Sequence, residues 1–571
     1  MRNRTIHMEL GLYVLIFLIA AGFRLIGLDR NSLTDAEASL ALQALELARG
    51  GSPALTGQPG YLVFTALLFF LTQATEFTAR FFPAIAGSVM IWAVYLFRIS
   101  LGRVASLVLA FFLAIEPGLV AASRQADGVI FTIAFGALGA GFLYQRRAAA
   151  GGVFLALALL GGPSVWVGVL SVGLAVVLSK VLLGKSVGDD ASDEDKASMD
   201  VGSWPWRAAL PWLAGGLIIL GTSFLWIPTG ISALFSDLAA FMSGWAQPTQ
   251  LPALRVFVIL AGYQPLAIFL GIAGIIAAFV KRDRSDLFLT TWFVVGLGVV
   301  LIYPGRHATD LVWALTPLWA LAARQSVRFI QLIHSDPKAF AGQVSLVFVL
   351  LIFSWLNMVA LSQQPAGAQI ESTRWLTLAG SLLLILVVSI LVAWSWSAHS
   401  AVGGLVWGVT AVLLIYTISS TVHAAGLGRQ PDAELWQRSP YVDQADLLLL
   451  TATNISQWNT RARDALELVI VDVPSPALAW AFRDYRNARI TSGLELASAP
   501  AMVITQEGEE LTLAASYTGQ SFVWQRLPIW DGVHWLRWRV VRAAPMDETS
   551  IILWVRSDLL PGSGSESSEE P

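Results

Sequence analysis

No cysteine occurs among the 571 residues of this chain, which excludes disulfides, zinc–thiolate sites and iron–sulfur clusters. Charge is also scarce: Asp, Glu, Lys and Arg make up 13% of the residues, and no basic tract is long enough to hold nucleic acid by neutralising its phosphates. Apolar residues are abundant instead, at 56% of the chain, and the mean hydropathy is +0.65. Most of these residues cannot face water, so the composition predicts an α-helical polytopic membrane protein.

Thirteen apolar runs approach the length of about 20 residues that a helix needs to cross the hydrocarbon core of a bilayer. The predicted spans cover residues 8–28, 79–99, 104–122, 128–144, 149–162, 164–183, 208–228, 258–280, 286–303, 309–324, 342–362, 373–396 and 402–423. The chain also has 23 Trp residues, which fits this interpretation because indole is favoured where the apolar core meets the lipid headgroups.

Basic residues in the short loops indicate the orientation, because cytoplasmic loops carry an excess of Lys and Arg. The basic clusters fall on one side if the amino terminus is cytoplasmic: Arg2 and Arg4, Arg98 and Arg103, Arg146 and Arg147, Lys180 and Lys185, Lys281 to Arg284, and Arg324 and Arg328. An odd number of spans then exports the carboxyl terminus. The apolar run 57–71 does not fit as a span, because a crossing there would invert every later basic cluster. We therefore expect a multi-pass plasma-membrane protein in which residues 29–78 form one long outer loop.

The remaining segments divide by composition. Residues 1–424 are predicted to form the transmembrane domain, interrupted at 185–203 by an acidic cytoplasmic linker without apolar periodicity. Residues 425–560 are predicted to form a soluble extracytoplasmic α/β domain, with short strand-like runs at 466–471, 501–505, 511–515 and 551–555. The Gly, Ser and Glu of residues 561–571 indicate a disordered tail.

Two carboxylates follow the first span closely, within the stretch Ser32-Leu33-Thr34-Asp35-Ala36-Glu37-Ala38. Thr34 to Glu37 matches a capping box, in which the Thr hydroxyl and the Glu carboxylate satisfy free amides at the start of a helix. A functional interpretation is a general base that takes a proton from an acceptor hydroxyl, with the second carboxylate orienting it or binding a divalent metal. Spacing alone favours the cap.

The stretch Arg24-Leu-Ile-Gly-Leu-Asp-Arg-Asn-Ser-Leu33, followed by the acidic pair and an Ala-rich helix, resembles the first outer loop of polyprenyl-phosphate-dependent glycosyltransferases of the GT-C fold. That class includes protein O-mannosyltransferases and aminoarabinose transferases. Residues 57–71, 76–83, Pro117 and 123–127 resemble further segments of the same family. Asp472, residues 480–485 and residues 535–539 resemble an uncharacterised bacterial and archaeal branch of flippase-associated proteins.

The resemblance implies a GT-C-like fold with about 13 transmembrane helices and a C-terminal extracytoplasmic α/β domain. It also implies a polyprenyl-phosphate-linked sugar as the donor, and Asp35 and Glu37 as the catalytic carboxylates. The family pattern places Asp and Glu next to each other, whereas Ala36 separates them here. If the following helix sets the register, Glu37 matches the family Glu and Asp35 lies one position early.

Several cations are candidates for the donor phosphate. Arg306 and His307 follow a predicted span within Tyr303-Pro-Gly-Arg-His307, where an Arg presents a fixed fork of donors. Arg124 has Asp127 at helical i, i+3 spacing, so the pair is either structural or part of a site at membrane depth. Arg80 opens a span, and there we favour a side chain that reaches the lipid headgroups over a substrate contact.

The outer loop at 229–252, with Asp237 and Trp245, could supply a surface on which a sugar stacks, although an interfacial Trp is the commoner explanation. Two functions from different classes remain. One is an inverting transferase that moves a sugar from a lipid phosphate to an extracytoplasmic glycan, lipid or protein. The other is a non-catalytic relative that binds the lipid carrier or assists a flippase, because fold does not fix function. A channel or transporter is a weaker third possibility, and nothing indicates a nucleotide cofactor or a nucleic-acid partner.

Overall fold

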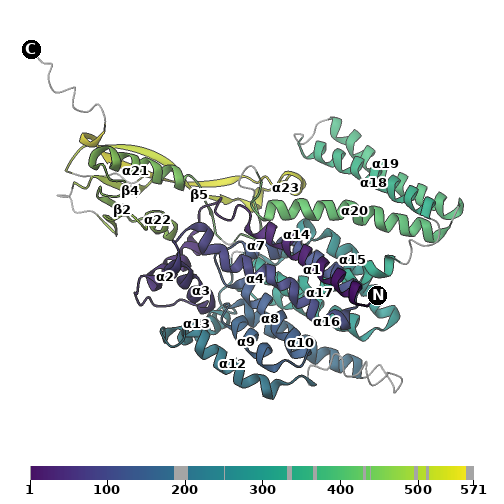
Figure 1. The fold of residues 1–571 in the computed structure, drawn as a ribbon. Helices are drawn as coiled ribbons and strands as arrows, with labels where there is room; N and C mark the ends of the chain where they lie inside the picture. The colour runs from purple at the N-terminus through teal and green to yellow at the C-terminus, as the bar shows by residue number, and fades with distance from the viewer. Residues whose placement is uncertain are drawn as a thin grey trace, which may run out of the picture.

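The computed structural model of the protein describes residues 2–184, 203–249, 251–330, 337–363, 369–395, 397–428, 433–437, 439–493, 499–508 and 514–560. The acidic linker predicted at 185–203 lies outside these residues apart from Ser203, and the tail predicted at 561–571 lies entirely outside them. The described chain forms a helical body, a projecting pair of helices and a mixed β-sheet (Figure 1).

Helices occupy most of the residues of the predicted spans. The helical body contains α1 (Arg2–Leu25), α4 (Glu76–Leu96), α5 (Arg98–Leu101), α6 (Arg103–Ala114), α7 (Pro117–Ser123), α8 (Val129–Tyr144), α9 (Ala148–Leu159), α10 (Ser164–Gly184), α12 (Trp206–Gly221), α14 (Ala253–Tyr263), α15 (Pro265–Lys281), α16 (Arg284–Ile302), η2 (Ala308–Leu311) and α17 (Val312–Ile330). The long helices α18 (Pro337–Ser362) and α19 (Gln369–Ser395) project from this body, and α20 (Ala398–Ala424) connects them to it (Figure 1).

The number of crossings is not confirmed as thirteen. Among the described residues, seven helices are long and apolar enough to cross a membrane, or up to nine if each of two bent helix pairs is counted as one span. Helices α8, α9 and α12 are apolar but have only 16, 12 and 16 residues. The chain is a multi-pass helical membrane protein in which several apolar helices are shorter than one crossing.

Two predicted spans are broken, which corrects the expectation of one continuous helix at 104–122 and at 258–280. Helices α6 and α7 meet at an angle of 56°, and α14 and α15 meet at 96°. Both second helices begin with a proline, Pro117 and Pro265. Proline lacks the N–H that would continue the helical hydrogen bonds and disfavours helical geometry at the residue before it, so both breaks follow from the sequence.

The two breaks contact each other inside the body. Gln264, at the second break, donates a hydrogen bond to the carboxylate of Glu116, which caps the start of α7. The fully buried Arg24 donates to the carbonyl oxygen of Ala114 at the end of α6, at 3.1 Å. Buried polar side chains therefore satisfy backbone groups that the breaks would leave unpaired away from water.

Three shorter helices gather at the end of the body opposite the amino terminus (Figure 1). They are α2 (Asp35–Ala48), α3 (Pro59–Leu71) and α13 (Thr229–Ser243). The capping box predicted at the start of α2 is confirmed, because the Thr34 side chain accepts from the Glu37 amide and the Glu37 side chain accepts from the Thr34 amide. Helix α3 has 13 residues and is about 20 Å long at 1.5 Å per residue, less than the hydrocarbon core.

The carboxyl-terminal part forms a six-stranded sheet in the order β1-β5-β6-β4-β2-β3. Its elements are β1 (Tyr441–Val442), α21 (Ala445–Thr460), β2 (Leu468–Val471), α22 (Pro476–Ala481), β3 (Ala488–Thr491), β4 (Met502–Gln506), β5 (Tyr517–Pro528), η4 (Trp530–Gly532), α23 (Trp535–Val541), β6 (Met546–Arg556) and η5 (Ser557–Leu559). Strand β2 pairs in parallel with β3 and β4, and the other pairs are antiparallel. The strands predicted near 466–471, 501–505 and 551–555 are confirmed as β2, β4 and β6, whereas most of the predicted run 511–515 lies outside the described residues.

The sheet domain packs against the helical body at α4 and the turn before it. Trp480 of α22 donates its indole N–H to Glu76 of α4 at 2.9 Å, and the guanidinium of Arg483 donates to the Ala74 carbonyl at 3.0 Å. Between α20 and the sheet, Trp436 lies edge-on to Tyr263, with 5.4 Å between the ring centroids. These contacts join the sheet to the helical body, and Trp436 also lines a cavity between them.

Candidate functional site

Glu37 is the centre of a buried ion pair. Its side chain is bidentate with Arg80, with distances of 2.8 Å from Nε to Oε1 and 2.9 Å from Nη2 to Oε2. The Ala126 N–H donates to Oε1 at 2.9 Å, and the Thr34 N–H donates to Oε2 at 3.0 Å. Only 7% of the Glu37 surface is exposed.

These contacts leave Glu37 poorly suited to accept a proton. Burial acts to raise the pKa of this carboxyl, but the charge and hydrogen bonds of Arg80, with the amides of Thr34 and Ala126, hold its pKa below the usual value. A general base works best when its pKa lies near the working pH. The geometry therefore favours a structural role for Glu37.

Arg80 is buried as well, which corrects the expectation that it reaches the lipid headgroups. Its remaining N–H groups donate to three carbonyl oxygens in the turn after α1: Leu28 at 3.1 Å, Asn31 at 2.6 Å and Ser32 at 3.2 Å. All five N–H donors of this guanidinium thus have acceptors. Arg80 lies near the start of α4. These hydrogen bonds therefore hold the turn after α1 against the beginning of that helix.

Asp35 faces a different partner from Glu37, although both lie in the first turn of α2. Its Oδ1 accepts from the Ser475 hydroxyl at 2.6 Å and from the Ala477 amide at 3.0 Å, and its Oδ2 accepts from the Gln525 side chain. Asp35 therefore joins α2 to α22 and β5. Asp35 lines neither of the two cavities that adjoin Glu37.

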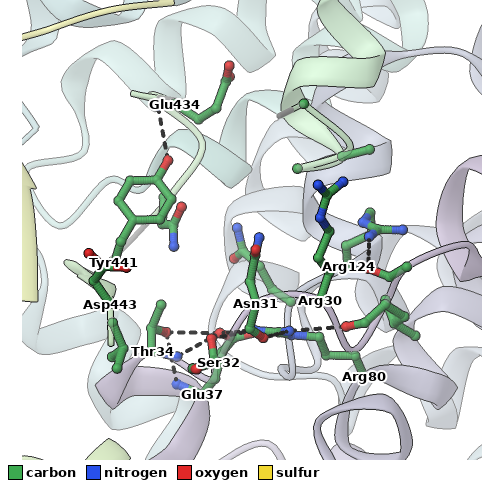
Figure 2. A pocket seen from close by; sticks show the side chains of 18 of the residues that line it. Arg30, Asn31, Ser32, Thr34, Glu37, Arg80, Arg124, Glu434, Tyr441 and Asp443 are labelled. Carbon is green, nitrogen blue, oxygen red and sulfur yellow. Dashed lines mark hydrogen bonds and ion pairs between the residues drawn. The ribbon is translucent and has the colours of Figure 1, made fainter. Parts of the chain in front are cut away.

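The larger cavity, of about 430 Å³, opens between the turn after α1 and the chain that follows α20. Figure 2 shows side chains that line it, with the Arg80–Glu37 pair along the bottom of the view and Tyr441 and Asp443 at the left. It is lined by residues 27, 28, 30–32, 34, 37, 80, 121, 124, 125, 423–426, 428, 434, 436, 437, 441–447 and 526. Because α1 ends at Leu25 and α20 at Ala424, the cavity lies at the level where two membrane-spanning helices end.

Two arginines of this cavity keep donors available. Arg124 donates through Nη1 and Nη2 to carbonyls at the end of α1, including Ile26 and Gly27 at 2.8 Å each, while its Nε–H makes no hydrogen bond to the described residues. Arg30 is exposed, and its one hydrogen bond to the residues that the structure describes is a long contact of 3.4 Å with the Leu427 carbonyl. In Figure 2 the two guanidinium groups lie on the same side of the Arg80–Glu37 pair. Arg124 and Asp127 do not lie in one helix, as their spacing had predicted, because α7 ends at Ser123.

A smaller cavity of about 240 Å³ adjoins the first, and the two share Thr34, Glu37, Gln125 and Gln437. Its other lining residues are Ala36, Ser39, Leu40, Gln58 and Asp127. Asp127 is 5% exposed, and one of its oxygens accepts from the Val129 amide at 3.0 Å. Hydroxyl, carboxamide and carboxylate groups thus surround this space, and arginine is absent from its lining.

Arg306 and His307 are not brought to either cavity. The Arg306 guanidinium donates to the carbonyls of Val300, Leu251 and Leu301, at 3.0, 2.9 and 3.1 Å, and so caps the end of α16. The amide of His307 donates to the Asp310 carboxylate at 2.8 Å. The structure therefore gives both residues a structural environment.

Most of the predicted loop at 229–252 is helix α13, and the two candidate side chains of this segment both contact other parts of the protein. Trp245 packs against Tyr303 and Phe241, with ring centroids 5.2 and 6.3 Å apart. Asp237 is buried in α13 beneath the turn that precedes α3. Among the described residues, no group of three or more His, Cys, Asp or Glu side chains could hold a metal ion.

Sequence reasoning did not select Arg30 and Gln58 as site residues. Both lie inside segments that carried the family resemblance, Arg30 in 24–33 and Gln58 in 57–71. A usable signal at Gln58 was a polar residue between Gly57 and Pro59 at the start of an apolar run. Arg30 offered no comparable signal, because surface arginines after a span are common.

Solved structures with a similar fold were found, whereas no protein-family model and no curated protein matches the chain. ArnT from Cupriavidus metallidurans bound to undecaprenyl phosphate matches with a TM-score of 0.55 and 15% identity, over 97% of this chain and 99% of that one. The apo state of the same protein matches with a TM-score of 0.56 and 15% identity, over 95% and 98%. An oligosaccharyltransferase from Archaeoglobus fulgidus matches at a TM-score of 0.40 and 14% identity, over 84% and 62%, and we draw nothing further from it.

The match to ArnT includes both the helical body and the carboxyl-terminal sheet, because it extends over nearly the whole of each chain. The fold predicted from the sequence is confirmed: the chain has the GT-C fold, with a carboxyl-terminal sheet domain.

Proposed function

We propose that this protein binds a polyprenyl-phosphate-linked sugar in the larger cavity and transfers the sugar to an extracytoplasmic acceptor. The observation that carries the proposal is the position of Arg30 and Arg124. Both line a cavity at the level where α1 and α20 end, and both keep N–H donors for an anion. A phosphate at that level could stay attached to a lipid whose chain remains in the membrane. The undecaprenyl phosphate bound to ArnT, a protein of the same fold, supports this donor class.

The orientation predicted from the basic loops is part of the proposal. In Figure 1 the amino terminus and the carboxyl-terminal sheet lie at opposite ends of the helical body. With a cytoplasmic amino terminus, the sheet, α2, α3 and both cavities face outside. The acceptor would therefore be an extracytoplasmic glycan, lipid or protein.

The chemistry needs a base on the side of the acceptor. The acceptor hydroxyl oxygen attacks the anomeric carbon, the bond from that carbon to the phosphate oxygen breaks, and the polyprenyl phosphate leaves with the electron pair. We assign the proton of the hydroxyl to Asp127, which lines the smaller cavity next to the proposed phosphate site. Arg30 and Arg124 stabilise the negative charge of the leaving phosphate.

A second function is favoured by one specific observation. Asp35 and Glu37, the two carboxylates that the family resemblance assigns to catalysis, are both held by protein partners. That arrangement suits a relative that binds the lipid carrier without transferring a sugar. The two functions agree on the phosphate site and differ in turnover.

The experiment measures the affinity of the purified full-length protein for undecaprenyl phosphate and, separately, sugar transfer from undecaprenyl-phosphate-linked sugars. Arg30→Ala and Arg124→Ala should each weaken lipid binding about tenfold or more, because a hydrogen bond to a charged group contributes about 1.5–3 kcal/mol. Arg306→Ala is the matched control, since Arg306 also donates to carbonyls at a helix end but lies outside both cavities.

The outcomes separate the candidates. Binding that depends on Arg30 and Arg124, together with transfer, supports the transferase. The same binding without transfer from any lipid-linked sugar supports the carrier-binding relative. Equal loss of binding in Arg124→Ala and Arg306→Ala, or no binding by the wild type, contradicts the phosphate site.

A further inference from the structure

The turn before α3 holds Gln58 in an uncommon conformation. Its φ and ψ are 52° and 49°, a left-handed backbone, directly before Pro59. Such a backbone is uncommon for a residue other than glycine and costs free energy. The preceding Gly57 has a φ of 137°, which favours glycine. The surroundings must therefore stabilise this turn.

Three separate segments hold Gln58. Its backbone N–H donates to both carboxylate oxygens of Asp237 in α13, at 3.1 and 3.0 Å. Its side-chain Oε1 accepts from the Gly128 amide at 2.7 Å. Gly162 leaves room for the side chain, because a Cβ atom there would lie 2.9 Å from Cγ of Gln58. The carboxamide consequently has a fixed orientation.

The burial of the Asp237 carboxyl lowers the stability of the folded protein. The side chain is 2% exposed, and burial raises its pKa to about 7, although the hydrogen bond from Gln58 acts in the opposite direction. A buried carboxylate needs compensating partners, and the hydrogen bonds described for Asp237 both come from the Gln58 amide. Strained or costly groups of this kind gather at functional sites. The group positioned here is the Gln58 carboxamide.

The Gln58 carboxamide lines the smaller cavity. Its oxygen is used by Gly128, whereas its Nε2 group makes no hydrogen bond to the described residues and carries two N–H donors. Ser39, Gln125 and Gln437 add hydroxyl and amide groups to the same wall. Neutral donors and acceptors of this type match the hydroxyl groups of a sugar, whereas the arginines of the larger cavity match a phosphate.

We propose that Gln58 binds a hydroxyl group of the lipid-linked sugar through Nε2, and that Asp237 is the positioning residue that holds Gln58 in place. The proposal rests on the function proposed above and locates the sugar in the smaller cavity. It makes Gln58 a determinant of sugar binding that is independent of the phosphate contacts.

The test compares the affinity of the full-length protein for undecaprenyl phosphate with its affinity for undecaprenyl phosphate carrying a hexose or aminoarabinose. The wild type should bind one of the sugar-bearing lipids about fivefold more tightly, the effect of a hydrogen bond of about 1 kcal/mol. Gln58→Glu keeps an oxygen for Gly128 but removes the Nε2 donors, so this gain should disappear while undecaprenyl phosphate still binds within about twofold. Gln58→Ala should lose the same gain.

Asp237 is tested by its coupling to Gln58. Asp237 does not contact the ligand in this proposal, yet Asp237→Ala should abolish the sugar-dependent gain in affinity. Asp237→Asn should keep part of that gain, because the amide oxygen can still accept from Gln58. Combining Asp237→Ala with Gln58→Ala should cost no more than Gln58→Ala alone. Asp531→Ala is the control, since that carboxylate is fully exposed.

The outcomes are distinguishable from failure of the proposed function. Equal binding of all the lipids by the wild type, or a sugar-dependent gain that persists in Gln58→Glu, overturns the inference while the phosphate site stands. Additive losses in the double variant overturn the positioning role of Asp237. A wild type that binds none of the lipids contradicts the proposed function and this inference together.

Discussion

The two cavities adjoin each other but differ in what their charged side chains are able to do. In the larger cavity, Glu37 pairs with Arg80 and Asp443 pairs with Arg526, while Arg30 and Arg124 keep donors available. In the smaller cavity, arginine is absent from the lining, and Asp127 is accompanied by hydroxyl and carboxamide groups. One space is suited to an anion and the other to a neutral ligand with hydroxyl groups.

The contrast shows why residue type alone does not identify a site. Arg80, Arg124 and Arg306 all lie near span ends, and each donates to backbone carbonyls. Arg80 has no N–H left, and Arg306 lies away from both cavities. Arg124 differs from Arg80 because it keeps N–H donors that packing has not used. It differs from Arg306 because it lines a cavity.

The largest effect is expected at Asp127, a carboxylate that lines the smaller cavity but not the larger one. Asp127→Asn keeps the shape and removes the base, so sugar transfer should fall about 100-fold to 10,000-fold, while undecaprenyl phosphate still binds. The measurement is turnover of a lipid-linked sugar beside the affinity for undecaprenyl phosphate. Transfer within threefold of the wild type would exclude Asp127 as the base and return the assignment to Asp35 or Glu37.

The next effect concerns the ion pair in the wall between the cavities. Arg80→Met should lower the free energy of unfolding by about 3–5 kcal/mol, because it leaves Glu37 buried without its cation. Thermal unfolding in detergent measures this, with Arg98→Met as control, since Arg98 is partly exposed and lies 4.0 Å from Glu9. Equal changes in the two melting temperatures would show that the Glu37–Arg80 pair contributes little to folding.

The sequence predicted the parts of this site that depend on neighbours along the chain. The capping box from Thr34 to Glu37 was predictable because its donors and acceptors are three residues apart. The helix positions were predictable from the apolar runs, and Pro117 and Pro265 contained the information for the two breaks. The length of an apolar run predicted membrane crossings less well, because an apolar helix that is buried within the body need not cross the membrane.

The partners of these residues could not be predicted, because packing brings them from distant segments. Arg80 is 43 residues from Glu37, and Ser475 is 440 residues from Asp35. Two carboxylates in one helical turn suggested one shared task, but successive side chains of a helix point in different directions. The fold therefore assigns Glu37 to the turn after α1 and Asp35 to the sheet.

A smaller effect is expected at Asp237, which supports the smaller cavity from behind. Its folded-state pKa of about 7 lies above the unfolded value of about 3.9, so the folded protein binds the proton more tightly. The stabilisation of the folded protein by this tighter proton binding is fully present below about pH 4, and it is lost as the pH rises to about 7. Stability of the wild type relative to Asp237→Asn should therefore fall by on the order of 2 kcal/mol between pH 5 and pH 8. Thermal unfolding of both proteins at both pH values tests this. A stability difference between them that does not change with pH contradicts the raised pKa of Asp237.

The smallest effect is expected at Asp35, which lines neither cavity and contacts the sheet instead. Asp35→Asn keeps one oxygen for Ser475 and Ala477 but places an amide opposite the Gln525 side chain. We expect a loss of about 1–2 kcal/mol in unfolding free energy, seen as a lower melting temperature, and transfer within about threefold of the wild type. Asp484→Asn is the matched control at the same interface, because the Asp484 side chain is 76% exposed and should leave both quantities nearly unchanged. A fall in transfer of 100-fold or more at an unchanged melting temperature would instead establish Asp35 as the catalytic carboxylate. That result would place the base on the sheet side of α2 and end the division of roles between the two cavities.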